Sequence, residues 1–295
     1  MIMSAERDCI LIADAGGTST AWGMARPEQC GGPRSFRCGA INAALMTHED
    51  IAAALAPVKK EIGGARVAEI WFFGAGCATP EIEESTARIL ASAFGMDLSR
   101  ITVRSDLYGA ALALWGDEPG IACILGTGSA SCMWDGREIA DAVPSLGYVL
   151  GDEGSGAHLG KLLLNAYFKR RLPENLQKAL QEEFPQLTLG GALHAVYREK
   201  GANGWLASFA PFLSRHSHDP YIAEIAEKSF REFCDSNLAY FRSHYPECRN
   251  VAFAGSLASA FSGVLSEAVA EAGFELKKTV ADPIDSLIRY YSRNL

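Results

Sequence analysis

The sequence predicts an α/β protein with two domains, and three observations lead to this prediction. The chain has 295 residues, of which 48% are hydrophobic, so it is longer than one usual domain and can bury a large core. Short apolar runs typical of buried strands alternate with amphipathic stretches typical of helices. Both halves also open with a strand, a turn of Gly, Thr and Ser, and a second strand, in DAGGTSTAWG and LGTGSASCMW. This likeness indicates a duplicated unit.

The first half alternates strands and helices. Its predicted elements are, in order, strands 9–15 and 20–25, a helix opened by Thr47, strand 67–73, a helix opened by Thr79 and Pro80, strand 101–103 and helix 107–115. Thr47 with Asp50 three residues later is a capping-box pattern, typical of a helix start. Pro57 is expected to kink or end that helix, because proline has no N–H for the helical hydrogen bond.

The second half starts after the strongest turn signal in the chain, Gly116-Asp117-Glu118-Pro119-Gly120. We therefore predict an N-terminal domain over 1–116 and a C-terminal domain over 117–282, with a terminal helix 283–295 that packs back on the N-terminal domain. The predicted elements of the second half are strands 121–125, 130–134 and 137–142, helices 153–171, 173–184 and 190–199, a long helix opened by Asp219 and Pro220, strand 250–254 and helix 257–272.

Charge and cysteine content narrow the class of protein. With 27 Lys and Arg against 35 Asp and Glu, the formal net charge is −8, which opposes binding to the phosphates of nucleic acid or of a membrane, so neither partner is expected. Arg7 and Asp8 interrupt the N-terminus before an apolar run develops, so no signal peptide is expected. None of the eight cysteines forms a C-x-x-C pair, which indicates buried thiols in a reducing, cytoplasmic compartment.

Three glycine-containing turns, at 16–20, 126–129 and 255–256, each follow a predicted strand. Glycine lets backbone N–H groups converge on phosphate oxygens without a Cβ in the way. One such turn is typical of an ordinary hairpin, but three together favour a phosphate-binding protein. None fits the P-loop or the G-x-G-x-x-G pattern, so neither of those nucleotide sites is predicted.

Four segments resemble the sugar kinase/Hsp70/actin superfamily and, within it, the BadF/BadG/BcrA/BcrD ATPase-type group that contains N-acetylglucosamine kinases. They are Asp14-Ala-Gly-Gly-Thr-Ser-Thr, Ser105-Asp106 before a helix, Gly126-Thr127-Gly128-Ser129, and Gly151-Asp152-Glu153-Gly154-Ser155-Gly156, and Gly255-Ser256 stands in the position of the adenosine-side turn. The likeness covers nearly the whole chain in the same order. It implies two duplicated ribonuclease H-like (actin-like ATPase) domains with a hinge and an interdomain cleft in which nucleotide and sugar meet, and a homodimer.

The same resemblance implies a role for each matching residue. ATP phosphates would be held by Gly16, Gly17, Thr18 and Ser19 and by Gly126, Thr127, Gly128 and Ser129, with Gly255 and Ser256 on the adenosine side. Asp14 would hold Mg²⁺ through water, and Asp106 would be the catalytic base that accepts the proton of the sugar hydroxyl. The sugar would be bound by Asn42, Asp106, Thr127, Gly151, Asp152 and Glu153.

Simpler interpretations stay open for several of these residues. Asp106 also suits a helix N-cap, and Asn42 suits a turn. Asp152 and Glu153 suit the acidic first turn of helix 153–171, where they would favour the helix dipole.

The chain also departs from the family pattern at two positions. Ser19 stands where close relatives often have Lys, and Ala130 stands where many have Asn. A missing Lys removes a charge partner for phosphate but leaves the backbone turn, so we expect weaker ATP binding. His158 and His194 look like ordinary helical residues.

The predicted function is an ATP- and Mg²⁺-dependent kinase that phosphorylates a hexosamine, foremost N-acetylglucosamine at O6. One alternative is an ATPase activator of an iron-sulfur 2-hydroxyacyl-CoA dehydratase type enzyme, but Cys123 and Cys132 fall in predicted strands and do not suit cluster loops. Another is a non-catalytic sugar-sensing protein. A regulator of that kind needs a DNA-reading module, and we expect no helix-turn-helix before a first strand near Cys9.

Overall fold

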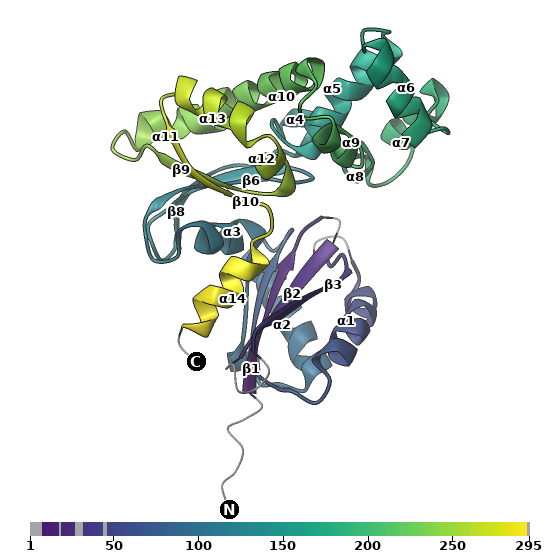
Figure 1. Ribbon diagram of the computed structural model, residues 1–295. Coiled ribbons are helices and arrows are strands. Elements are labelled where there is room, and N and C mark those ends of the chain that lie inside the picture. The colour runs from purple at the N-terminus through teal and green to yellow at the C-terminus, as the bar shows by residue number, and fades with distance from the viewer. Residues whose placement is uncertain (1–7, 18, 27–31, 44–45, 294–295) are drawn as a thin grey trace, which may run out of the picture. The chain divides into compact units, whose positions relative to one another are not determined.

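The computed structural model describes residues 8–17, 19–26, 32–43 and 46–293. Contacts within the chain divide it into two units. Unit 1 comprises Met1–Glu118, Asp135–Ile139 and Asp282–Leu295, and unit 2 comprises Pro119–Trp134 and Ala140–Ala281. Each unit contains one five-stranded sheet (Figure 1).

The sheet of unit 1 has the strand order β3-β2-β1-β4-β5. Its strands are β1 (Asp8–Ala15), β2 (Ser19–Ala25), β3 (Arg34–Gly39), β4 (Arg66–Gly74) and β5 (Ile101–Ser105). The first three strands are antiparallel, whereas β4 and β5 run parallel to β1. The C-terminal ends of β1, β4 and β5 therefore lie at one edge of the sheet.

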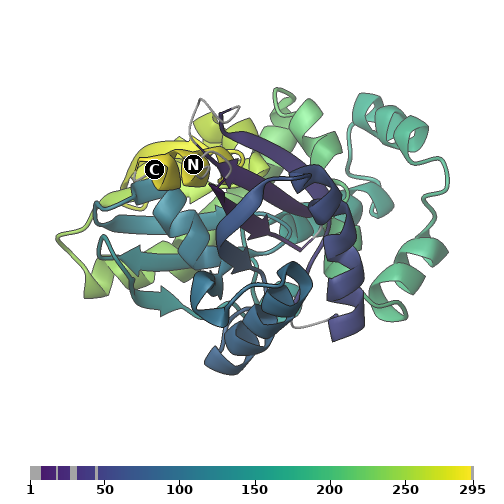
Figure 2. The same ribbon diagram turned by 90° about the horizontal axis from the view of Figure 1, so that it is seen from below.

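Helices cover both faces of this sheet. The helices α1 (His48–Ile62) and α2 (Pro80–Phe94) pack against each other and share a core with one face, as the two blue helices of Figure 2 show. On the other face lie α3 (Asp106–Trp115) and α14 (Ile284–Ser292). The approach of α14 requires Gly23 on β2, because a Cβ there would lie 2.5 Å from Cγ1 of Ile288.

The first helix begins as predicted but does not end at Pro57. Thr47 and Asp50 form the capping box, and α1 continues past Pro57 to Ile62, so the predicted end or break is wrong. Pro57 is exposed, and so is Ala53, whose carbonyl group loses its helical partner. Water can hydrate that carbonyl, which lowers the cost of proline inside the helix.

The sheet of unit 2 has the order β10-β9-β6-β7-β8. Its strands are β6 (Gly120–Leu125), β7 (Ser129–Trp134), β8 (Ile139–Val143), β9 (Asn250–Ala254) and β10 (Glu275–Val280). As in unit 1, the first strand lies in the centre, with its antiparallel neighbour on one side and two parallel strands on the other. The α/β fold class with two equivalent mixed sheets, as in actin-like ATPases, is thereby confirmed.

The rest of unit 2 is mostly helical. Its helices are α4 (Gly147–Leu150), α5 (Gly156–Phe168), α6 (Glu174–Glu183), α7 (Leu189–Tyr197), α8 (Ala202–Ala207), α9 (Ala210–Arg215), α10 (Pro220–Phe233), α11 (Ala239–His244), α12 (Ser256–Ala260) and α13 (Ser262–Glu271). The long helix predicted after Asp219 is α10, which continues through a π-helical segment, Cys234–Leu238, into α11. The single helix predicted over 257–272 is divided at Phe261. In both views α6 and α7 extend beyond the sheet (Figures 1 and 2).

Within the described part of the chain, no helix combines the length and the apolar character that crossing a bilayer requires.

The packing of α5 on α8 depends on Gly160. A Cβ at this position would lie 2.0 Å from the carbonyl oxygen of Leu206. Gly160→Ala is expected to destabilise unit 2 by about 1 to 3 kcal/mol, because a backbone carbonyl cannot move aside as a flexible side chain can. Gly204→Ala, within α8 where nothing lies within 4 Å of the new Cβ, is the matched control. Urea unfolding measures the difference, and equal midpoints for the two variants would contradict this packing.

Candidate functional site

The predicted site residues gather in two groups, one in each unit. In unit 1, Asp14 lies near the end of β1, and Asp106 follows β5 as the first residue of α3. Between these strands, Gly74 of β4 pairs with both Ala15 and Ser105. Parallel strands separated by one neighbour lie on the order of 10 Å apart, so the two aspartates share one edge of the sheet.

Negative charge accumulates at this edge. The pKa of Asp14 is raised to about 7, first by burial of its carboxyl group and then by the negative charges of Asp106 and Asp282, whereas Arg37 acts in the opposite direction. A bound dication would offset this repulsion and favour the ionised form of Asp14. The acidic edge therefore has the electrostatics of a cation site.

Mg²⁺ fits these residues. It usually takes one or two protein carboxylates and completes its octahedron with water and phosphate oxygens. Among the described residues, no three His, Cys, Asp or Glu side chains gather closely enough to hold a metal ion by themselves. A Mg²⁺ ion held by Asp14 would therefore complete its coordination with water and with oxygen atoms of a bound ligand.

The first glycine turn connects β1 and β2 beside Asp14. The N–H of Gly16 donates to the carbonyl oxygen of Ser19 at 3.1 Å, which closes the turn. Gly17 is exposed within it, and the predicted phosphate ligand Thr18 lies outside the described residues. Arg37 of β3 donates to Oγ of Ser19 at 3.1 Å and forms an ion pair with Asp282. A guanidinium group therefore lies next to the turn, a feature that the sequence analysis missed because only the pairing of β2 with β3 reveals it.

Asp106 is not the N-cap of α3, so that simpler interpretation is wrong. The cap is Ser105, whose Oγ accepts from the N–H of Tyr108 at 3.2 Å. Oδ1 of Asp106 accepts from the N–H of Leu107 at 2.9 Å. Burial raises the pKa of Asp106, and backbone hydrogen bonds from Leu107 and from Asp106 itself oppose the rise. Among the described residues, the hydrogen-bond partners of this carboxyl group are backbone N–H groups, and Oδ1 takes the one from Leu107.

Asn42 lies in a turn shortly after β3. Its carbonyl oxygen accepts from the N–H of Met46 at 3.0 Å, and its own N–H points to the sulfur of Met46 at 3.3 Å. The preceding Ile41 donates to Oγ1 of Thr20 at 3.0 Å, which ties this segment to the start of β2. These contacts agree with a turn residue, and sugar binding by Asn42 stays a prediction.

The second group, in unit 2, is built on the turn between β6 and β7. The N–H of Gly126 donates to the carbonyl oxygen of Gly128 at 3.0 Å. The carbonyl oxygens of Gly126 and Thr127 accept from the N–H groups of Gly156 and Ala157, at 2.8 and 3.1 Å. The backbone N–H groups of Thr127 and Gly128 have no hydrogen-bond acceptor among the described residues. They are free to bind phosphate oxygens.

Up to Ser155, the segment 151–156 is a loop rather than the start of a helix. Asp152 has φ +61° and Gly154 has φ +78°, both in the left-handed region, and α5 begins only at Gly156. The interpretation of Asp152 and Glu153 as first-turn acids of helix 153–171 is therefore wrong. Instead, Oδ1 of Asp152 accepts from the N–H of Ser129 at 3.2 Å.

The carboxylate of Asp152 also lies so close to the backbone of Gly128 that a side chain at position 128 would collide with it. A Cβ at Gly128 would lie 2.9 Å from Oδ1 of Asp152, so the turn and the carboxylate can approach only without a side chain there. Burial raises the pKa of Asp152, and the hydrogen bond from Ser129 opposes the rise. Glu153 lies beside it, partly exposed, and its Oε2 accepts from Oγ of Ser236 at 3.4 Å.

The third glycine turn joins the same group. Gly255, between β9 and α12, has φ +127°, and a Cβ there would lie 2.1 Å from the carbonyl oxygen of Leu125. Leu125 is the residue before Gly126, so Gly255-Ser256 lies beside the turn 126–129. The N–H of Gly255 donates to the carbonyl oxygen of Val280 at 2.9 Å, which holds this turn against β10.

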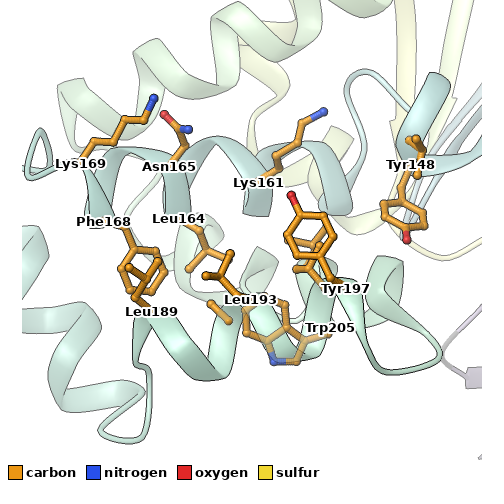
Figure 3. A pocket seen from close by; sticks show the side chains of 14 residues that line it. Tyr148, Lys161, Leu164, Asn165, Phe168, Lys169, Leu189, Leu193, Tyr197 and Trp205 are labelled. Carbon is orange, nitrogen blue, oxygen red and sulfur yellow. The ribbon is translucent and has the colours of Figure 1, made fainter.

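A cavity of about 670 Å³ lies elsewhere in unit 2. Figure 3 shows Phe168 of α5 beside Leu189 of α7, with Trp205 of α8 below, whereas Lys161 and Lys169 extend from the other side of α5. Its lining includes none of the predicted site residues. We therefore do not place the chemistry of this protein there.

The cysteines do not form a cluster site in the described part of the chain. The seven described cysteines are free thiols, and Cys30 lies outside the described residues. Burial raises the pKa of Cys132 and of Cys234 to about 12, so both are thiols at neutral pH. Iron-sulfur clusters are held by thiolates, which these environments oppose.

The two equivalent mixed sheets, each with a glycine turn after its first strand, define a class, the proteins with two actin-like ATPase domains, to which sugar kinases belong. No protein-family model matches the sequence, and no curated protein matches it. Among solved structures, a protein from Porphyromonas gingivalis described as a putative N-acetylglucosamine kinase is 39% identical. The alignment covers 97% of this chain and 99% of that chain, with a TM-score of 0.87. The chain therefore belongs to the sugar kinase family of that protein.

Two more distant structures share the fold. A putative N-acetylglucosamine kinase from Chromobacterium violaceum is 21% identical, with a TM-score of 0.69 over 97% of this chain and 99% of that chain. A ROK family glucokinase from Streptomyces griseus, in complex with glucose and AMPPNP, is 16% identical, with a TM-score of 0.59 over 97% of this chain and 100% of that chain. Membership in the narrower BadF/BadG/BcrA/BcrD group stays a prediction.

Proposed function

We propose that the protein is a kinase that transfers the γ-phosphoryl group of ATP to O6 of N-acetylglucosamine. The observation that carries this proposal is the 39% identity to the Porphyromonas gingivalis protein over 97% of this chain. The Streptomyces griseus glucokinase, whose structure contains glucose and AMPPNP, supports ATP as the phosphoryl donor.

In this proposal Asp106 is the general base. The O6 hydroxyl gives its proton to the Asp106 carboxylate, and O6 forms a bond to the γ-phosphorus as the bond from that phosphorus to the bridging oxygen of ATP breaks. The products are the sugar 6-phosphate and ADP, and the proton stays on Asp106 until solvent removes it. The raised pKa of Asp106 supports this role, because a more basic carboxylate accepts a proton more readily.

The glycine turns hold the phosphates in this proposal. The N–H groups of Thr127 and Gly128, which have no partner among the described residues, donate to phosphate oxygens. In the turn at 16–19 the N–H of Gly16 is already taken by the carbonyl oxygen of Ser19, so the N–H of Gly17 is the donor proposed there, and Gly255-Ser256 lies on the adenosine side. When bound at Asp14, Mg²⁺ would neutralise charge on the β- and γ-phosphates.

Arg37 adds a positive charge that the family pattern does not predict. The family resemblance implies Lys at position 19, and here the guanidinium of Arg37 donates to Ser19 instead. We propose that Arg37 supplies the charge partner that Ser19 cannot, so ATP binding is weakened less than the sequence alone suggests.

The sugar ligands proposed from the family are Asn42, Thr127, Gly151, Asp152 and Glu153. Oδ1 of Asp152 already accepts from Ser129, so its second oxygen is the one available to a sugar hydroxyl. If one Asp152 oxygen binds the turn 126–129 and the other binds the sugar, the binding of ATP and the binding of sugar would depend on each other.

An ATPase activator of an iron-sulfur enzyme is the competing function, and metal analysis separates the two. Protein purified without oxygen is expected to contain no iron-sulfur absorbance, and the denatured chain is expected to titrate as eight thiols, its full cysteine count. Stoichiometric iron with an absorbance band that dithionite bleaches would favour the activator instead.

A coupled assay of ADP release across a panel of sugars tests the proposed activity. N-acetylglucosamine is expected to give the highest kcat/KM, above glucosamine, N-acetylmannosamine and glucose. The control reaction without sugar is expected to release ADP far more slowly, because the proposed chemistry needs a hydroxyl acceptor. ADP release at one rate with every sugar and with none would contradict a sugar kinase.

A further inference from the structure

His158 is a buried polar side chain that the proposed reaction does not use directly. It lies in the first turn of α5 with only 5% of its surface exposed. Its ring has three polar neighbours: Nδ1 lies 3.4 Å from the backbone nitrogen of Gly154 and 2.8 Å from Oγ of Ser229, and Nε2 lies 3.3 Å from Oε2 of Glu232. Nδ1 is therefore hydrogen-bonded, and Nε2 lies near a carboxylate.

These neighbours assign the tautomer of the ring. A backbone N–H can only donate, so Nδ1 must accept from Gly154 and carries no proton. The hydroxyl of Ser229 is then also a donor and shares the one lone pair of Nδ1 with the N–H of Gly154, and the ring proton is on Nε2, which lies 3.3 Å from Oε2 of Glu232. Burial lowers the pKa of His158 to about 4, with Lys161 and Lys228 acting in the same direction, which agrees with a neutral ring.

The hydrogen bond at Nδ1 binds Gly154, which lies in the middle of the loop 151–156. Two residues before Gly154, Oδ1 of Asp152 accepts from the N–H of Ser129. On the other side, Gly156 donates to the carbonyl oxygen of Gly126. Both contacts end on the turn 126–129, so movement of the loop would release that turn as well.

We propose that His158 is a positioning residue: its Nδ1 holds Gly154, and through the loop 151–156 it keeps the turn 126–129 in the form that binds phosphate. This inference rests on the proposed function only for its effect on ATP. The anchoring of the loop stands on the contacts of unit 2 alone. His158 itself contacts neither substrate in this proposal.

Two substitutions of almost equal shape test the role of Nδ1. His158→Asn places an amide oxygen near the position of Nδ1, and His158→Leu places a methyl group there. Both remove the ring and leave a similar cavity, so the difference between them isolates the acceptor. The leucine variant leaves the N–H of Gly154 and the hydroxyl of Ser229 without their acceptor.

Two readouts are measured on both variants. Hydrogen exchange of the peptide covering 151–157 is expected to be about tenfold faster in His158→Leu than in His158→Asn, since one buried hydrogen bond to the loop is lost. The KM for ATP is expected to be about tenfold higher in the leucine variant, with kcat within about threefold of the asparagine variant. Thermal unfolding confirms that both variants fold.

The outcomes separate the anchoring from the kinase activity. Faster exchange in the leucine variant of a protein that phosphorylates no sugar would support the anchoring and overturn the proposed function. Equal exchange and equal KM in two folded variants would overturn the role of His158 and leave the kinase intact. If His158→Leu does not fold, Ser229→Ala provides the comparison: the inference expects slow exchange there, since Nδ1 still holds Gly154, and fast exchange would contradict it.

Discussion

Replacing Asp106 with asparagine is expected to lower kcat by roughly 10² to 10⁴ while binding of N-acetylglucosamine survives. Asparagine keeps the shape of the side chain and an oxygen for the N–H of Leu107, but it cannot take the proton of O6. Single-turnover kinetics measures the chemical step, and titration calorimetry measures sugar binding.

The neighbouring residue provides the control for this variant. Ser105→Ala removes the N-cap of α3 and is expected to cost about 1 kcal/mol of stability while kcat stays within a few-fold. A stable Asp106→Asn protein with near-normal kcat would show that Asp106 is not the base. Loss of activity in both variants would indicate that the position of α3, rather than the proton acceptor, limits the rate.

Asp14→Asn is expected to abolish most activity and, at the same time, to stabilise the ligand-free protein. The pKa of Asp14 is raised to about 7, so between pH 4 and 7 the folded state binds a proton that the unfolded state has released. Stability therefore falls as pH rises through this window, and at pH 8 the ionised carboxylate costs the fold about 2 kcal/mol or more. Asparagine removes that cost and also removes the carboxylate proposed to hold Mg²⁺.

The expected result is a rise in Tm of roughly 4 to 8 °C at pH 8 that disappears near pH 4. Asp97→Asn is the control, because hydrogen bonds from Ser99 lower the pKa of Asp97 and its removal should reduce stability. Differential scanning calorimetry at both pH values gives the comparison. A Tm for Asp14→Asn that is lower than that of the natural protein at pH 8 would contradict repulsion at the acidic edge.

The sequence predicted the order of strands and helices well where local signals are strong. The hairpin of β6 and β7 consists of the predicted apolar run, the glycine turn and the returning strand. The helix α1 begins at the predicted capping box. Hydrophobic periodicity did not predict the elements whose formation depends on tertiary contacts. Two helices of six residues, α8 and α9, went unnoticed because such short segments show no clear period.

The sequence proposes candidate site residues by type but does not specify their geometry. Asp152 and Glu153 precede an apolar stretch and look like the first turn of a helix. In the fold, the left-handed conformations of Asp152 and Gly154 delay the helix to Gly156 and bring the Asp152 carboxylate to Ser129. No local signal specifies that contact, because its partner lies 23 residues away.

The same limit applies to the two side chains that the sequence analysis missed. Arg37 meets Ser19 only through the register of β2 with β3. Nδ1 of His158 meets the hydroxyl of Ser229, which lies 71 residues further along the chain. Both are common residue types in ordinary positions of a strand and a helix. Their roles follow from packing between distant segments.

The most direct test of the central claim is the identity of the reaction product. The protein is incubated with ATP, Mg²⁺ and N-acetylglucosamine, and the phosphorylated sugar is examined by ³¹P–¹H correlation NMR. We expect a phosphate coupled to the two protons on C6, formed in equal amount with ADP. Phosphate coupled to the proton on C1, or ADP formed together with free phosphate and no sugar phosphate, would contradict the proposed transfer to O6.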